Sequence, residues 1–178
     1  MTRLTMVTMT AILLVLSGFA AEGIAKQHNE MTRLQKEVRH ELVMLPYYSV
    51  FDYFTFSVKE GEVTLMGYVS RPTLRKSAER VVKSIEGVTL VNNEIKVLPV
   101  SPNDDRIRRA VYRAIYYHPT MSRYAIQAIP PVHIIVENGD VTLLGVVGSE
   151  MDKTIANIQA NGVSGVFSVS NKLEVTRD

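Results

Sequence analysis

The chain has 178 residues, of which 46% are hydrophobic and 21% are charged, and its formal net charge is +2. This composition is typical of a globular protein with room for one ordinary domain or two small ones, and the weak net charge does not favour nucleic acid as a partner. The absence of cysteine excludes disulfides, thiolate metal sites, a cysteine nucleophile and a lipidated N-terminal cysteine.

Residues 1–25 are typical of a secretory signal peptide. Arg3 supplies a positive charge, residues 4–21 are uncharged, and small residues lead to a cleavage site after Ala25, with Ala20 as an alternative position. The apolar core is short for a membrane span of about 20 residues, which favours cleavage. The alternative is an uncleaved membrane anchor. In both cases the folded part lies outside the cytoplasm, so we expect a periplasmic or secreted protein.

Residues 30–98 predict a first domain that is built from alternating helices and strands. Apolar residues at helical spacing indicate an amphipathic helix over 30–45, which a proline ends. A hairpin over 54–69 follows, then a helix over 70–85 and a strand over 88–97. Each element is short, so the domain is small.

After a linker at 99–103, the same order of elements recurs in a second domain over 104–178. Asp104 and Asp105 begin its first helix, where carboxylates suit the unpaired N–H groups. An insert at about 120–131 separates this helix from the hairpin. The hairpin turns at Asn138-Gly139, the residue pair that such turns favour.

The two regions match as an internal repeat. Residues 60–67 align with residues 138–145, which places Gly61 and Gly139 at an offset of 78 positions. The alignment continues without a gap to the last strand, so we interpret the chain as two copies of one domain. The fold class is α+β, with two tandem α-β-β-α-β domains. Each is a three-stranded mixed sheet covered on one face by two helices, because a crossover helix makes its third strand parallel to a neighbour.

The residues that recur in both copies are predicted to determine the fold rather than to perform chemistry. Gly67 and Gly145 lie within strands, where glycine is unfavourable unless backbone or a helix approaches closely, and we expect a helix to pack over them. The two asparagines are expected to bind nearby backbone groups. The recurring set is Gly61, Gly67, Gly87, Asn93, Gly139, Gly145, Gly165 and Asn171.

The repeated pattern resembles the BON domain (bacterial OsmY and nodulation domain). It consists of Gly-x-Val-Thr-Leu-x-Gly at 61–67 and 139–145, then Gly-Val and Val-x-Asn at matching places in both copies. The resemblance implies a non-enzymatic envelope module without a cofactor. It also implies binding to phospholipid surfaces and a role in osmotic or envelope stress protection. The insert in the second copy departs from a minimal domain.

One candidate site is the first helix of the second domain, which is rich in arginine and tyrosine. Guanidinium groups pair with lipid phosphates, and tyrosine favours the membrane interface. The alternative is a solvated basic face with the tyrosines packed inside. The candidate lipid-binding residues are Arg106, Arg108, Arg109, Tyr112, Arg113, Tyr116 and Tyr117.

A second candidate site is a set of apolar residues beyond those needed for the core. The helix over 149–161 has one stripe at Ala156 and Ala160, expected to face the sheet, and another at helical spacing elsewhere. The second stripe is either a contact surface or the true core. The outer sheet face is also apolar, as in domain packing or a ligand groove. The candidate contact residues are Met151, Ile155, Ile158, Ile135, Leu144 and Val146.

No residue pattern indicates catalysis or metal binding. The four histidines have no ligand-like spacing, and no nucleophile motif or repeated acid pair is present. We therefore expect a non-enzymatic protein that binds an anionic phospholipid surface or an envelope protein, and not nucleic acid. The alternative is a protein–protein adaptor or self-associating module that uses the apolar patches of the second domain.

Overall fold

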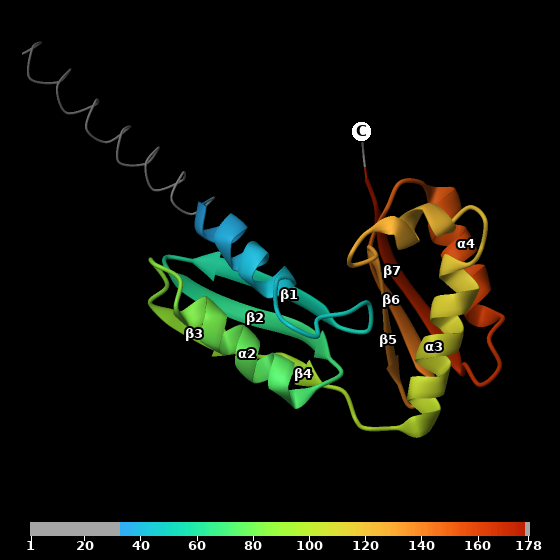
Figure 1. The fold of residues 1–178 in the computed structure, drawn as a ribbon, viewed down its shortest axis with the longest axis horizontal. Coiled ribbons are helices and arrows are strands. Elements are labelled where there is room, and N and C mark those ends of the chain that lie inside the picture. The colour runs from blue at the N-terminus through green and yellow to red at the C-terminus, as the bar shows by residue number, and fades with distance from the viewer. Residues whose placement is uncertain (1–32, 177–178) are drawn as a thin grey trace, which may run out of the picture.

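The computed structural model describes residues 33–176 and contains two α+β domains joined by a short connection (Figure 1). The predicted signal peptide lies outside the described residues. No helix within residues 33–176 has the length and apolar character needed to span a bilayer.

The first domain consists of two helices packed on one face of a mixed sheet. A helix over 33–43 precedes β1 (Tyr53–Lys59), β2 (Glu62–Val69) and α2 (Pro72–Lys83). The third strand is divided into β3 (Leu90–Asn93) and β4 (Lys96–Val97), and both pair in parallel with β2. β1 pairs antiparallel with β2, so it forms one edge of the sheet.

The second domain repeats this arrangement and adds a short turn of 3₁₀ helix. Its elements are α3 (Pro102–Tyr116), η1 (Ser122–Ile126), β5 (Val132–Glu137), β6 (Asp140–Val147), α4 (Glu150–Asn161) and β7 (Ser168–Val175). β5 pairs antiparallel and β7 pairs parallel with β6. The predicted tandem α-β-β-α-β fold is therefore confirmed. The helix α3 begins two residues before Asp104, because Ser101 caps it by accepting from the Asp104 N–H.

The recurring asparagines join the last strand to the helix before it. The Asn171 amide donates to the Lys153 carbonyl at 2.8 Å, and its oxygen accepts from the Leu173 N–H. Asn93 makes the equivalent bonds to the Arg75 carbonyl and to the Ile95 N–H. The expectation that these asparagines bind backbone groups is confirmed in both copies.

The mid-strand glycines have a different role from the one that the sequence predicts. Gly67 and Gly145 have φ of 118° and 116°, in the region that favours glycine. A Cβ on Gly67 would lie 2.0 Å from the Tyr53 carbonyl oxygen, and one on Gly145 would lie 1.9 Å from the Pro131 carbonyl oxygen. The prediction of a helix over them is wrong: the backbone of the partner strand makes the close approach.

The two domains are joined by a loop of the first domain that inserts into the second. Val50 belongs to the second domain's hydrophobic core, and its carbonyl accepts from the Ile134 N–H on β5 at 2.8 Å. The Phe51 ring meets the Tyr112 ring edge to face, with centroids 6.2 Å apart. The insertion therefore connects the first domain directly to the core of the second.

A buried histidine at the junction between the domains should make the stability of the protein depend on pH. The His133 Nδ1 lies 2.6 Å from the Asp52 carbonyl oxygen, and Tyr48 and Tyr53 pack against the ring. Burial lowers the pKa of His133 from its ordinary value of 6.5, although the Asp52 carbonyl opposes this. Between the lowered pKa and pH 6.5 the unfolded chain therefore binds more protons at this site than the folded chain does.

We expect the free energy of unfolding to fall as pH decreases from 6.5 toward the lowered pKa of His133. His133→Asn keeps a donor for the Asp52 carbonyl but cannot titrate, so it should flatten this part of the profile. Urea unfolding of both proteins across this pH range checks the prediction. Identical slopes in the two profiles would contradict it.

Candidate functional site

The outer side of α3 presents a stripe of exposed basic residues that ends in a tyrosine. Arg106, Arg109 and Arg113 are exposed, and Tyr117, just after the helix, is 74% exposed. Their spacing of three and four residues places them on one face, opposite the buried stripe formed by Ile107, Val111 and Ile115. These four residues are the accessible part of the predicted lipid-binding set.

The other three members of that set face β5 and have structural partners. Arg108 is only 4% exposed and donates to the Val136 carbonyl at 2.6 Å. The Tyr116 hydroxyl donates to the Val132 carbonyl at 2.7 Å and accepts from the Val132 N–H at 3.0 Å. Tyr112 is half-buried against Phe51. These residues lie four apart on a second face, which the sequence-based prediction merged with the first.

The helix α4 turns its alanines to the sheet, as the repeat predicts. Ala156 and Ala160 are fully buried, so the alternative in which the other apolar stripe forms the core is wrong. Met151 is 68% exposed and Ile158 is 59% exposed, whereas Ile155 is half-buried against the core. Two of the three predicted residues on this helix are therefore accessible.

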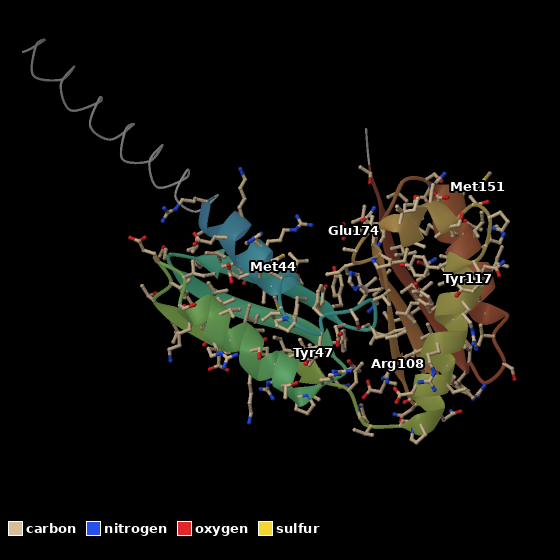
Figure 2. All side chains as sticks on the ribbon, viewed as in Figure 1. Met44, Tyr47, Arg108, Tyr117, Met151 and Glu174 are labelled. Carbon is tan, nitrogen blue, oxygen red and sulfur yellow. The ribbon has the colours of Figure 1, made fainter. Side chains whose placement is uncertain are left out.

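The exposed residues of α3 and α4 form one continuous surface. The Arg106 guanidinium, near the start of α3, donates to the Ser164 carbonyl just after α4. Arg123, just after α3, binds Asp152 near the start of α4, so the helices are antiparallel neighbours. Figure 2 shows Tyr117 and Met151 toward the same end, on the side away from the first domain. The two-helix face consists of Arg106, Arg109, Arg113, Tyr117, Met151 and Ile158.

The two-helix face is positive, and its accessible carboxylates, Asp105 and Glu150, lie only at the beginnings of α3 and α4. The sequence from Arg106 to Tyr117 contains no acidic residue, and from Met151 to Val163 the only one is Asp152. Asp152 is 1% exposed, and its carboxylate accepts from Ser149, Tyr124 and Arg123. Burial alone would raise its pKa, but these hydrogen bonds lower it below its ordinary value. A surface that combines cations with apolar side chains suits an anionic partner with an apolar layer.

The predicted apolar face of the second sheet is partly covered by the first domain. Ile135 is 3% exposed and lies near Tyr68, and Leu144 is half-buried near Tyr53 and Tyr68. Domain packing therefore accounts for these two residues. Val146 remains 44% exposed, where it lines a groove between the domains. Phe167, the residue just before β7, is 86% exposed.

Within residues 33–176 no three histidine, aspartate or glutamate side chains are grouped so that they could hold a metal ion. The most buried carboxylates have structural partners. Asp104, for example, accepts from the N–H groups of Asn138 and Gly139 in the hairpin turn.

Comparison with known proteins gives one family and several solved structures. The model of the BON domain matches residues 32–99 and again residues 103–177. A search of curated proteins gives no match. Two structures of CdsD, a structural protein of the type III secretion system of Chlamydia trachomatis, align at 15% and 12% identity. They cover 81% and 80% of this chain and 92% and 96% of their own, with TM-scores of 0.29 and 0.28.

Proposed function

Because the chain belongs to the BON domain family, with two copies in tandem, we propose that it is a non-enzymatic envelope protein that binds anionic phospholipid surfaces. The proposal places it in the periplasm or outside the cell and assigns contact with the lipid to the two-helix face. Protection of the envelope under osmotic or other stress is the physiological role that we propose for it.

The observation that supports this proposal is the pairing of basic and apolar side chains on the two-helix face. Three arginines can pair with lipid phosphates, while Tyr117, Met151 and Ile158 can enter the headgroup layer. Each basic residue near an anionic surface contributes about 1 kcal/mol at physiological ionic strength. The face is small, so we expect binding to be reversible and sensitive to salt.

Co-sedimentation of the full chain with vesicles tests the proposal. We expect binding to vesicles with anionic lipid and much weaker binding to neutral vesicles. Arg109→Glu together with Arg113→Glu should weaken binding at least about tenfold, because the face loses two attractions and gains two repulsions. The matched control is Arg80→Glu with Lys83→Glu, which changes the same number of charges on exposed residues of α2.

Weak, equal binding to both kinds of vesicle would remove the lipid proposal. If the α2 control lost as much binding as the α3 variant, the first domain would share the contact, and the assignment to the two-helix face would be wrong.

The exposure of Met151 and Ile158 also supports a second candidate, an adaptor that binds another protein or a second copy of itself. Met151→Asp with Ile158→Asp distinguishes the two, since both side chains are exposed and neither belongs to the core. Loss of a protein complex with vesicle binding intact would favour the adaptor. Ile155 is unsuitable for this test because it packs against the core.

A further inference from the structure

The outer edge of β5 in the second domain is closed by other parts of the chain. In a two-residue hairpin, alternate residues direct their N–H and C=O groups away from the partner strand. In β5 these residues are Val132, Ile134 and Val136. The Tyr116 hydroxyl binds both backbone groups of Val132, the Val50 carbonyl accepts from the Ile134 N–H, and Arg108 donates to the Val136 carbonyl.

The equivalent edge of β1 in the first domain is closed only at Phe54, whose backbone hydrogen-bonds with Tyr48. Phe54, Phe56 and Val58 lie 78 positions before Val132, Ile134 and Val136, in a hairpin of the same register. Among residues 33–176, no hydrogen bond from outside the sheet reaches the backbone of Phe56 or Val58.

The duplicated helices differ at the positions that close the edge in the second domain. Alignment of their buried stripes places Gln35, Arg39 and Val43 where Arg108, Tyr112 and Tyr116 lie in the second domain. The tyrosine that satisfies the β5 edge is therefore replaced by a valine. Tyr48 takes over the bond at Phe54, and within residues 33–176 the outward backbone groups of Phe56 and Val58 remain available for a new strand.

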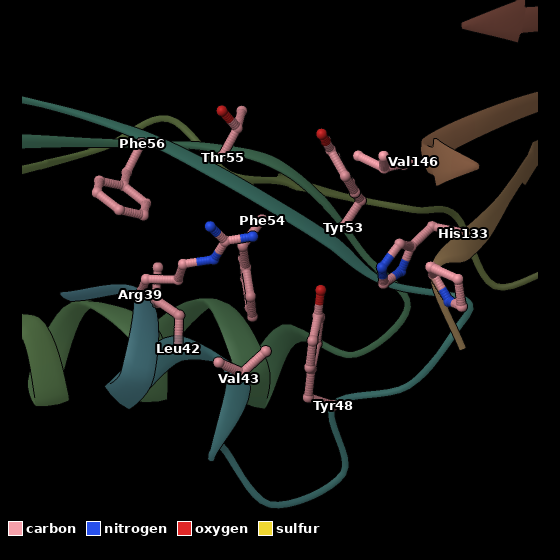
Figure 3. A pocket seen from close by; sticks show the side chains of 12 residues that line it. Arg39, Leu42, Val43, Tyr48, Tyr53, Phe54, Thr55, Phe56, His133 and Val146 are labelled. Carbon is pink, nitrogen blue, oxygen red and sulfur yellow. The ribbon is translucent and has the colours of Figure 1, made fainter. Parts of the chain in front are cut away.

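A groove of about 400 Å³ follows this edge between the two domains (Figure 3). Arg39 and Val43 line it from the first helix, Phe54 and Phe56 from β1, and His133 and Val146 from the second domain. No acidic residue lines it, and Arg39 makes no ion pair within residues 33–176. The groove therefore combines a strand edge that is free at Phe56, an aromatic wall and an uncompensated cation.

We propose that this groove binds an extended peptide segment of a partner protein, which adds to β1 as a further strand. Its backbone pairs with the outward groups of Phe56, an apolar side chain packs on Phe54 and Phe56, and a carboxylate meets Arg39. Strand addition supplies affinity through backbone hydrogen bonds and specificity through alternate side chains. Val50 makes one backbone hydrogen bond of this kind with β5 within this molecule.

Selection of random dodecapeptides displayed on phage against the full chain tests the proposal. We expect enrichment of sequences in which apolar residues alternate with other residues near an aspartate or glutamate. For a selected peptide, hydrogen exchange of the Phe56 amide should slow on binding, whereas that of Ile134 should not change. Failure to enrich such sequences, or an unprotected Phe56 amide, would overturn the proposal.

Variants of the first helix localise the binding. Val43→Tyr places a large side chain in the groove, at a position that is 41% exposed, and should weaken peptide binding at least about tenfold. Arg39→Glu should have an effect of similar size. The control Lys36→Glu alters an exposed residue of the same helix that does not line the groove, and should change affinity less than about twofold.

Peptide binding that survives both groove variants would overturn the assignment. Self-association of the chain that Val43→Tyr abolishes would mean that a second copy occupies the edge, and this too would overturn a peptide partner.

Discussion

Replacing Gly145 by alanine is expected to lower the free energy of unfolding by about 3 kcal/mol or more, from two causes. The residue has φ of 116°, which costs an L-residue about 1–3 kcal/mol. The new Cβ would also lie 1.9 Å from the Pro131 carbonyl oxygen, so β5 and β6 would have to separate at this point. Urea unfolding followed by circular dichroism measures the loss.

Two other glycines separate the causes. Gly87 has φ of 94°, and a Cβ added to it would meet no atom within 4 Å, so Gly87→Ala reports backbone strain alone. Gly162 has φ of −74° and its nearest contact would be 3.6 Å, so Gly162→Ala should be close to neutral. If Gly145→Ala were no worse than Gly87→Ala, the close approach to Pro131 would not matter.

The glycines illustrate what the sequence could and could not predict about the fold. Periodicity and the repeat at 78 positions predicted the order of helices and strands correctly, because those features depend on residues close in sequence. The sequence also indicated that something approaches Gly67 and Gly145. It could not say that the neighbouring strand makes this approach, since that depends on the local geometry of the hairpin.

The candidate site was predictable in composition but not in detail. Helical spacing placed Arg106, Arg109 and Arg113 together, and they are exposed together. The same spacing placed Arg108 and Tyr116 on a second face, but their burial depends on β5, which lies beside α3 only in the folded domain. The repeat itself held a usable signal, since Val43 replaces the equivalent tyrosine in the first copy.

The insertion of the loop at 49–52 into the second domain had no signal in the sequence. Val50 and Phe51 follow a helix in a region that patterns indicate only as a connection. Their role depends on Asp52, which is fully buried and has no equivalent in the second copy, where Pro130 occupies the matching position. A single buried carboxylate is thus what organises the connection between the domains.

The Asp52 carboxylate holds the loop through four hydrogen bonds. One oxygen accepts from the Ser70 N–H at 2.7 Å and from the Ser70 hydroxyl at 2.8 Å. The other accepts from the Ser49 N–H at 3.1 Å and from the Ser49 hydroxyl at 2.8 Å. Since an unsatisfied buried N–H costs about 1–3 kcal/mol, Asp52→Ala should lower the free energy of unfolding by about 3 kcal/mol.

The effect should also cross the domain boundary, because the loop that Asp52 shapes carries the Val50 carbonyl. We expect Asp52→Ala to accelerate hydrogen exchange of the Ile134 amide, 2.8 Å from that carbonyl, more than exchange of amides between β6 and β7. Asp52→Asn can satisfy only one of the two serines fully, so its loss should be intermediate. Asp140→Ala, which removes an exposed carboxylate bound to the Ser168 hydroxyl, is the control. Unchanged exchange at Ile134 in Asp52→Ala would mean that the domains hold their arrangement without this loop.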